Sequence, residues 1–170
     1  MTQVETGVRI RPARFREAEA IAGLNNFFAD QQIMLRRTPQ MIALGVDDYV
    51  VAVDGRGDIL ACGALKEYSP SIAEVAAIAV SPHAQGLGLG RTIVAAVEQL
   101  ARKRGIPEVF ALTLEPKFFE ALGYARVDRA RYPEKIRRDC IACARRFACN
   151  ETCFAKSLRD LADDRLDVAA

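Results

Sequence analysis

The sequence predicts an α/β domain in which helices flank a mixed central sheet. Short runs rich in valine, isoleucine and alanine alternate with segments whose apolar residues recur at helical spacing. The predicted order of elements is β-α-α-β-β-β-α-β-α-β, which is typical of a mixed sheet. Within it, the segment 74–91, EVAAIAVSPHAQGLGLGR, predicts a buried strand that leads through a glycine-rich loop directly into a helix.

The amino-terminal half contains three expected strands and two expected helices. The first helix is predicted by apolar residues that fall on one of its sides, namely Ala18, Ile21, Leu24 and Phe28. Thr38 and Pro39 are a plausible cap and first-turn proline for the second helix. The residues 54–57, Asp-Gly-Arg-Gly, are a hairpin signal between two apolar runs. We therefore expect strands over 8–11, 49–53 and 59–65, and helices over 14–28 and from 39 onward.

The carboxyl-terminal half begins with the strand 74–80. Ser81-Pro82 ends this strand, because proline cannot donate to a sheet ladder. The helix that follows the glycine-rich loop has one apolar face, formed by Ile93, Val94, Val97, Leu100 and Ala101. Gly105 and Pro107 end that helix. A strand over 109–113 and a short helix from 116 are then expected.

Length and composition favour a single domain, because 170 residues are ample for one core. The chain has 24 Lys+Arg and 22 Asp+Glu, so its charge gives no indication of a nucleic-acid partner. No apolar run approaches the length of a membrane span, and the N-terminus lacks a signal peptide's apolar stretch. We expect a cytoplasmic protein without a membrane partner, and the sequence leaves open whether it forms a homodimer.

The glycine-rich loop predicts a ligand that carries phosphate. A strand, a glycine loop and a helix N-terminus together present several backbone N–H groups to a phosphate, aided by the helix dipole. A nucleoside triphosphate loop would end in Gly-Lys-Ser/Thr, but Gly90 is followed by Arg91. A dinucleotide fingerprint needs two residues between its second and third glycines, whereas one residue separates Gly88 from Gly90. Neither of these two ligand classes fits.

Gln85, Gly88 and Gly90 instead match the pattern Gln/Arg-x-x-Gly-x-Gly/Ala. This pattern resembles the acetyl-CoA pyrophosphate loop of the GNAT acyltransferase superfamily, and the predicted order of elements is also that of the GNAT fold. The alternative is a glycine-rich turn that serves only the tight packing of a strand and a helix. The segment from Pro116 to Tyr124 also resembles the superfamily's short helix followed by Gly-Phe/Tyr.

The resemblance implies that acetyl-CoA is the cofactor and identifies the residues that contact it. Phe118 and Phe119 would lie beside the pantetheine arm, although one of the two is expected to be an ordinary core aromatic. The other implied coenzyme contacts are Ile78, Ala79, Val80, Gln85, Gly86, Leu87, Gly88, Leu89, Gly90 and Arg91. Residues 1–135 would then form the GNAT acetyltransferase core. Residues 136–170, a cysteine-rich loop and a C-terminal helix, would pack on the same domain.

Within the superfamily, the segment 33–38, Ile-Met-Leu-Arg-Arg-Thr, resembles the Leu-x-Arg-Arg-Ser/Thr segment of N-acetylglutamate synthase acetyltransferase domains. The segments 59–65, 74–80, 109–113 and 132–135 also resemble that family, so the likeness runs from about residue 8 to residue 135. The kinase-like domain of the long synthases is absent, which implies a short, stand-alone form. The implied reaction is acetylation of the α-amino group of an acidic amino acid, L-glutamate, in arginine biosynthesis.

The chemistry of that reaction selects further candidates. Guanidinium groups suit bidentate binding of a carboxylate, so Arg36 and Arg37 are candidates to hold the substrate, and the family match favours Arg37. The alternative for both is a basic surface loop. Glu74, at the start of the central strand, would take the ammonium proton directly or through water. A backbone N–H near Val80 would polarise the carbonyl oxygen.

The departing thiolate has no evident proton donor. Many GNAT enzymes place a tyrosine four residues before the Gly-Phe/Tyr turn, and here Phe119 occupies that position. Thr113, Tyr124 or water could substitute, and nothing in the sequence selects among them. Thr113, at the end of the strand 109–113, is also a candidate to contact the substrate.

Four of the five cysteines lie close together near the C-terminus: Cys140, Cys143, Cys149 and Cys153. A C-x2-C pair followed by a second pair is compatible with a structural zinc ion, although the gap of five residues is short. A redox-active or disulfide pair and free thiols are the alternatives. If 150–161 is helical, Cys149 and Cys153 share a helix face. Such a helix would depart from the long synthases, which finish with a strand.

Two residues are interpreted without a role in chemistry. Cys62 lies within a strand pattern and is expected to be buried, and His83 is expected to be a turn residue. Two other functions remain open beside acetylation of glutamate. One keeps acetyl-CoA and changes the amine acceptor. The other is a metal- or redox-responsive module that binds the coenzyme and uses the cysteine tail as a sensor.

Overall fold

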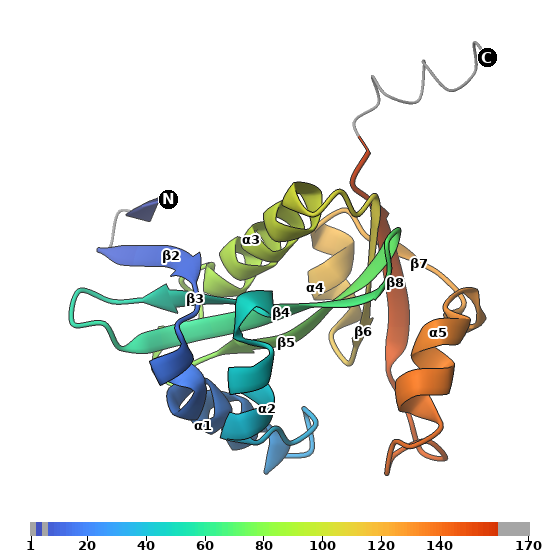
Figure 1. Ribbon diagram of the computed structural model, residues 1–170, viewed down its shortest axis with the longest axis horizontal. Coiled ribbons are helices and arrows are strands. Elements are labelled where there is room, and N and C mark those ends of the chain that lie inside the picture. Colours follow the sequence, from blue (N-terminus) through green and yellow to red (C-terminus); the bar gives the residue numbers. More distant parts are fainter. Residues whose placement is uncertain (1–2, 5–6, 160–170) are drawn as a thin grey trace. The chain divides into compact units, whose positions relative to one another are not determined.

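The computed structural model describes residues 3–4 and 7–159, and it shows a mixed sheet with helices beside it (Figure 1). The strands are hydrogen-bonded in the order β1-β2-β3-β4-β5-β6-β8-β7. The pair β5–β6 is parallel, whereas β1–β2, β2–β3, β3–β4, β6–β8 and β7–β8 are antiparallel. The predicted mixed α/β sheet is therefore confirmed. The strands are β1 (Gln3–Val4), β2 (Val8–Pro12), β3 (Tyr49–Val53), β4 (Ile59–Ser69), β5 (Ile72–Val80), β6 (Glu108–Thr113), β7 (Ala125–Arg126) and β8 (Thr152–Ser157).

The predicted helices are also present, with small differences at their ends. A 3₁₀ turn over Phe15–Glu17 precedes the first α-helix, and a π-helical turn over Ile136–Cys140 follows the last one. The α-helices are α1 (Ala18–Ala29), α2 (Pro39–Leu44), α3 (Leu89–Lys103), α4 (Pro116–Ala121) and α5 (Pro133–Lys135). In the part of the chain that the structure describes, none of them combines the length and the hydropathy that a membrane crossing requires.

The chain forms two compact units. The first unit comprises Met1–Lys66 and Val75–Leu100, and the second comprises Glu67–Glu74 and Ala101–Ala170. Their boundaries cut through β4, β5 and α3, so each unit receives part of these elements.

The core of the first unit lies between the α1–α2 pair and the strands β3 and β4. Its buried members include Ile21, Ile42, Val51 and Cys62, each with essentially no exposed surface. Thr38 caps α2 as predicted, because its hydroxyl accepts a hydrogen bond from the Met41 N–H at 3.1 Å. That bond satisfies one of the backbone donors that a helix N-terminus leaves unpaired.

Gly63 in β4 is a point of close approach between α3 and the first unit's strands. A Cβ atom at this position would lie 2.5 Å from Ile93 Cγ2 and 2.7 Å from Ile78 Cδ1. Both distances are well inside van der Waals contact, so only glycine fits between the helix and the two strands. The apolar face of α3 predicted from Ile93, Val94 and Val97 is buried as expected.

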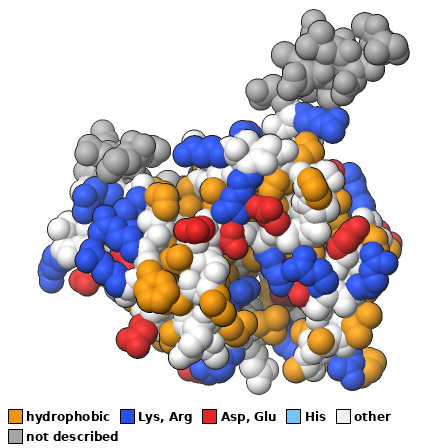
Figure 2. All heavy atoms as spheres, in the orientation of Figure 1, with side chains coloured by type: hydrophobic (Ala, Val, Ile, Leu, Met, Phe, Trp, Pro, Cys, Tyr) orange, Lys and Arg blue, Asp and Glu red, His pale blue; other side chains and the backbone are white. Residues whose placement is uncertain are grey.

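Basic side chains gather on one part of the first unit's surface. Figure 2 shows Lys and Arg on the left of this face, where β2 and the β3–β4 turn lie in Figure 1. There, an open pocket of about 450 Å³ is lined by five arginines together with Glu17 and Asp58. Arg11 and Glu17 form a bidentate pair at 2.9 and 2.6 Å, with side chains only 13% and 11% exposed.

The second unit is built on β6, which has a strand on each side. β5 runs parallel to it, with Glu74 opposite Phe110, and β8 runs antiparallel to it from Glu108↔Ser157 to Thr113↔Thr152. Its core contains Phe110, Tyr132, Cys153 and Ala155. The rings of Phe110 and Tyr132 stack with centroids 4.0 Å apart.

The helix expected over 150–161 is wrong, because Thr152–Ser157 forms β8; residues 160–161 lie outside the described residues. The physical reason is burial on both faces. Cys153, Phe154 and Ala155 are consecutive and all buried, and their backbone pairs with both β6 and β7. An amphipathic surface helix would bury only one side. The departure from the long synthases that the sequence suggested is therefore also wrong, since a strand follows the cysteine-rich loop.

Candidate functional site

The glycine-rich loop belongs to the first unit and follows β5 through a 3₁₀ turn over Pro82–Ala84. Gly86 and Gly88 have φ angles of +80° and +76°, in the left-handed region that favours glycine. A Cβ atom at either position would meet no protein atom within 4 Å. Tight packing of strand and helix therefore does not explain these two glycines. They let the backbone turn and leave the space in front of it open.

The loop leads into α3, whose first turn presents backbone N–H groups. The Thr92 N–H and hydroxyl both bond to the Gly88 carbonyl, each at 3.1 Å. The N–H groups that precede Thr92 in the first turn have no acceptor within the helix. They add to the positive end of the helix dipole at an exposed loop. The arrangement suits a phosphate or pyrophosphate group.

Hydrogen bonds from side chains of the loop and of the preceding turn stabilise its conformation. The Gln85 carboxamide donates to the Val80 carbonyl at 3.3 Å, which ties the loop to the end of β5. Ser81 Oγ and His83 Nδ1 are hydrogen-bonded at 2.8 Å, so His83 is a turn residue, as the sequence indicated. Leu87 is 55% exposed at the tip of the loop.

The backbone of β5 is distorted just before Ile78–Val80. Ala77 has a φ of +54°, a conformation that costs an L-residue roughly 1–2 kcal/mol. The Cys62 thiol donates to the Ala77 carbonyl at 3.7 Å. Such strain persists only where the surrounding structure holds it, and it is concentrated at functional sites. Here it lies beside the strand end whose backbone N–H groups the sequence assigned to the thioester.

Arg36 and Arg37 are adjacent in sequence but are placed differently. Arg36 pairs with Asp30 on the surface, with side chains 61% and 64% exposed. Arg37 is half-buried. Burial raises the pKa values of Tyr49 and Cys62, that of Cys62 to about 12, and the positive charge of Arg37 offsets part of both increases. The Arg37 guanidinium therefore faces the inside of the first unit, and the Arg36 guanidinium faces solvent.

Two asparagines of α1 hold the loop that carries Arg37. Asn26 Nδ2 donates to the Arg37 carbonyl at 2.8 Å, and Asn26 Oδ1 accepts from the Arg37 N–H at 2.9 Å. Asn25 Nδ2 donates to the Leu35 carbonyl at 2.9 Å. Asn25 is 1% exposed, and its Oδ1 has no hydrogen-bond partner among the described residues. Two adjacent asparagines among the apolar residues of the second half of α1 are the signal that could have indicated this role.

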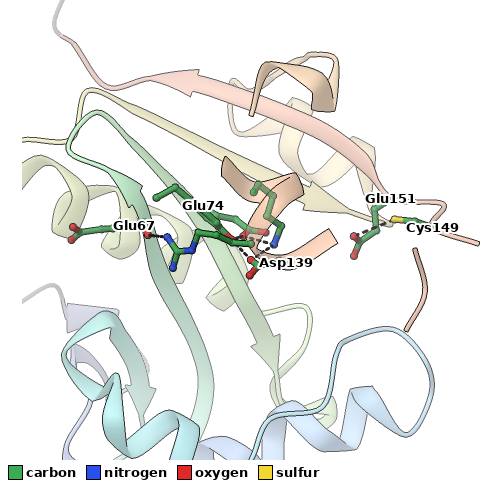
Figure 3. Close-up of polar contacts among 8 residues, drawn as sticks. Glu67, Glu74, Asp139, Cys149 and Glu151 are labelled. Atoms are coloured by element: carbon green, nitrogen blue, oxygen red, sulfur yellow. Dashed lines mark hydrogen bonds and ion pairs between the residues drawn. The ribbon is translucent and has the colours of Figure 1, made fainter. Parts of the chain in front are cut away.

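Glu74 lies in the second unit and is only 6% exposed. Its Oε2 accepts hydrogen bonds from the Tyr68 hydroxyl at 2.9 Å and from Lys135 Nζ at 2.8 Å. Lys135 also donates to Asp139 Oδ2 at 3.1 Å, and the Tyr68 hydroxyl, which has one hydrogen to give to either carboxylate, also contacts that oxygen. Figure 3 shows the carboxyl groups of Glu74 and Asp139 directed toward one another with these contacts between them. We call these four residues the Glu74 cluster.

The charges of the Glu74 cluster perturb its own members. Burial raises the pKa of Tyr68, and the negative charges of Glu74 and Asp139 raise it further. Burial lowers the pKa of Lys135, but the charges and hydrogen bonds of the two carboxylates outweigh that effect and raise it overall. Tyr68 therefore stays a phenol and Lys135 stays an ammonium. Glu74 Oε1 accepts no hydrogen bond from the part of the chain that the structure describes.

The sequence indicated Glu74 but gave no sign of Tyr68 or Asp139. Tyr68 and Asp139 are 71 positions apart, and Glu74 and Lys135 are 61 positions apart. Only the fold brings them together, so no spacing pattern in the sequence could have found the cluster. For Lys135, the sequence indicates only that it lies in the segment 132–135, which resembles the synthases.

Phe118, Phe119 and Thr113 are also in the second unit. Phe119 is 6% exposed and packs edge-on against Phe118 and Tyr124, with ring centroids 5.2 and 5.1 Å away. It is the core aromatic of the pair, and Phe118 is half-buried. Thr113 is buried, and its hydroxyl accepts from the Glu115 N–H at 2.8 Å before α4 begins. Thr113 thus has a structural partner at the strand end.

The structure does not gather the cysteines of the tail. Among residues 3–4 and 7–159, no group of three or more His, Cys, Asp or Glu could hold a metal ion, and all five cysteines are free thiols. Cys153 is buried in β8, where burial raises its pKa to about 11. Cys149 Sγ accepts from Arg129 Nη2 at 3.3 Å. The Cys149 thiol donates to Glu151 Oε2 at 3.8 Å (Figure 3). The structure therefore gives the zinc interpretation no support.

Comparison with known proteins agrees with this architecture. Residues 15–126 match the acetyltransferase (GNAT) family. An uncharacterized N-acetyltransferase of Chlorobaculum tepidum is 36% identical over 149 residues, which are 88% of this chain and 96% of that protein. An amino-acid acetyltransferase of Mycobacterium tuberculosis is 31% identical over 121 residues, which are 70% of this chain and 69% of that protein.

Among solved structures, N-acetylglutamate synthase from Neisseria gonorrhoeae, complexed with coenzyme A and N-acetyl-glutamate, has a TM-score of 0.81 at 27% identity. The match covers 92% of this chain but only 36% of the synthase, so the present chain spans about a third of that protein. The family match extends over more than half of the sequence and includes the glycine-rich loop. The chain belongs to the acetyltransferase (GNAT) family.

Proposed function

We propose that this protein is an acetyl-CoA-dependent N-acetyltransferase that acetylates the α-amino group of an acidic amino acid, L-glutamate. The observation that carries the reaction type is Glu74: a buried carboxylate with one oxygen held by Lys135 and Tyr68 and the other without a donor among the residues that the structure describes. A carboxylate held in this way can accept the proton that an ammonium group must lose before it becomes a nucleophile. The likeness to a synthase solved with coenzyme A and N-acetyl-glutamate supports the same reaction.

The glycine-rich loop fits the coenzyme's pyrophosphate. Gly86 and Gly88 leave the space in front of the backbone open. The first turn of α3 offers N–H groups that have no acceptor within the helix. When bound, acetyl-CoA supplies the acetyl group as a thioester. Backbone N–H groups of Ile78–Val80, beside the strained Ala77, would hold the thioester carbonyl and favour the negative charge that develops on its oxygen.

Arg37 supports an acidic acceptor. Arg37 is half-buried, and two hydrogen bonds with Asn26 fix the backbone from which its side chain extends. A guanidinium group can bind a carboxylate through two parallel hydrogen bonds. Arg36 is already paired with Asp30 on the surface. Of the two arginines, Arg37 is therefore the one suited to hold the substrate.

The test is acetyl-CoA turnover with a panel of free amino acids, read by the mass of the acetylated product. Acetylglutamate should dominate, and Arg37→Ala should lower kcat/KM for glutamate by about 10²-fold or more, as expected for a lost charge-assisted bidentate contact of roughly 3 kcal/mol. Arg36→Ala is the matched control and should change kcat/KM less than about threefold. Equal losses in the two variants would refute the role of Arg37. Turnover with a different acceptor would refute glutamate as the substrate.

A further inference from the structure

We propose that Tyr68 and Asp139 form the route by which the proton collected by Glu74 leaves the protein. This inference rests on the proposed function, in which Glu74 takes the proton of the substrate ammonium group. Each turnover leaves Glu74 protonated, and the next turnover cannot begin until that proton has gone. The Glu74 side chain is only 8% exposed, whereas the Asp139 side chain is 26% exposed. Asp139 is therefore the carboxyl group from which solvent can remove the proton.

The Tyr68 hydroxyl bridges the two carboxyl groups. It lies 2.9 Å from Glu74 Oε2 and hydrogen-bonds to Asp139 Oδ2 as well. A phenol carries one hydrogen and has lone pairs that accept, so it can receive a proton on one side while giving its own to the other. Burial and the neighbouring carboxylates raise the pKa of Tyr68, which disfavours the phenolate form. A concerted transfer, with the phenol intact before and after it, avoids that form.

The transfer begins when Glu74 has been protonated on Oε1. Protonation weakens the hold of Lys135 on Oε2, and the last side-chain torsion of glutamate is broad and twofold, so a half-turn brings the new O–H toward Tyr68. The Glu74 O–H bond then breaks as a new O–H bond forms on Tyr68. At the same time, the original O–H bond of Tyr68 breaks and an O–H bond forms on Asp139 Oδ2. Asp139 finally releases the proton to water or buffer, and no redox change occurs.

Lys135 lowers the electrostatic cost of moving the negative charge between the two carboxylates, and it does not itself transfer a proton. Its ammonium nitrogen lies 2.8 Å from the Glu74 oxygen and 3.1 Å from the Asp139 oxygen. When the negative charge moves from Asp139 to Glu74, the ammonium remains paired with a carboxylate in both states. An ammonium group has three donors and no acceptor, and the raised pKa of Lys135 keeps it in that form. It cannot receive the proton from Glu74, which leaves Tyr68 as the bridging group.

The test compares Tyr68→Phe and Asp139→Asn with matched controls. Tyr132→Phe removes another buried phenol that donates to a carboxylate, Glu108, at 2.7 Å. Arg137→Ala changes an exposed residue in the same π-helical turn as Asp139. Both relay variants should complete the first turnover at the wild-type rate in rapid-quench measurements and then turn over about 10- to 100-fold more slowly. Small buffer acids and bases such as imidazole should restore part of the lost rate, and the controls should show neither effect.

The outcomes separate this inference from the proposed function. Glu74→Gln should abolish the first turnover itself, so a fully active Glu74→Gln protein would refute the base. If Glu74→Gln is inactive but both relay variants lack the burst and the buffer rescue, the relay is wrong and the base stands. Should Tyr68→Phe fail to fold, Asp139→Asn carries the test alone, because Asn keeps the shape of the side chain and removes the carboxylate that would take up the proton. A buffer-independent loss in that variant would show a merely structural role and overturn the proposal.

Discussion

Replacement of Lys135 by methionine should destabilise the protein strongly. The ammonium lies 2.8 and 3.1 Å from two carboxylate oxygens, and its side chain is 13% exposed. At an effective dielectric constant of about 20, each contact is worth roughly 5–6 kcal/mol before the cost of burying the charge. The desolvation cost cancels much of that sum. Removing one partner of a buried pair nonetheless costs about 3–5 kcal/mol, because the other charges stay buried without it.

The matched control for Lys135→Met is Arg36→Met. The ion pair of Arg36 with Asp30 has both side chains more than half exposed, so its loss should cost less than about 1 kcal/mol. Urea unfolding followed by circular dichroism measures both free energies, and similar slopes would show that the extent of unfolding is unchanged. The reasoning is refuted if the two variants lose equal stability, because burial would then not govern the value of the pair.

The pH dependence of the unfolding free energy provides a second test of the contribution of Lys135. The pKa of Lys135 is raised in the folded protein above its ordinary value of 10.5, because the two carboxylates outweigh the effect of burial. The group therefore contributes its full stability below the unfolded-state pKa and loses it as the pH rises through the folded-state pKa. The wild-type protein should lose this part of its stability above about pH 10.5. The methionine variant should lack that alkaline loss.

Two glycine substitutions test the loop and the core. Gly88→Ala should raise the KM for acetyl-CoA about tenfold or more, because the methyl group would occupy the space in front of the backbone that we propose binds the pyrophosphate. Gly57→Ala, also at positive φ with open space around it, is the control and should leave that KM unchanged even if stability falls by about 1 kcal/mol. Gly63→Ala should cost about 1–3 kcal/mol of unfolding free energy through overpacking against Ile93. Gly23→Ala, in open space within α1, should stabilise by about 0.5–1 kcal/mol, and the opposite order in urea unfolding would contradict this packing.

Local signals in the sequence predicted most of the fold. The Thr38 cap, the hairpin at 54–57 and the apolar face of α3 depend on residues within a few positions of one another, and the structure shows each of them. The prediction of a helix over 150–161 is wrong because the apolar run 153–155 is short enough to suit either a helix or a strand. Its pairing with β6, more than 40 positions earlier in the chain, decided the outcome.

In the candidate site, too, features formed by neighbouring residues were predictable from the sequence, and features formed by distant residues were not. The glycine-rich loop is contiguous, so its spacing alone predicted backbone donors that approach a phosphate. The Glu74 cluster depends on pairs more than 60 positions apart, which one sequence cannot reveal. The cysteine spacing suggested a metal site, but the spacing of residues along the chain does not determine where their thiol groups point in the fold. The strand that holds Cys153 buries its thiol in the core.

Asn26 holds the backbone at position 37 and not the side chain. Both of its hydrogen bonds go to the backbone N–H and C=O of that position, and neither involves the arginine side chain. The same two bonds would form around lysine, glutamine or leucine. If Arg37 holds the acceptor's carboxylate as proposed, folding of the loop and selection of the acceptor are separable, and a single codon change at position 37 would alter which amino acid is acetylated while the scaffold stays intact.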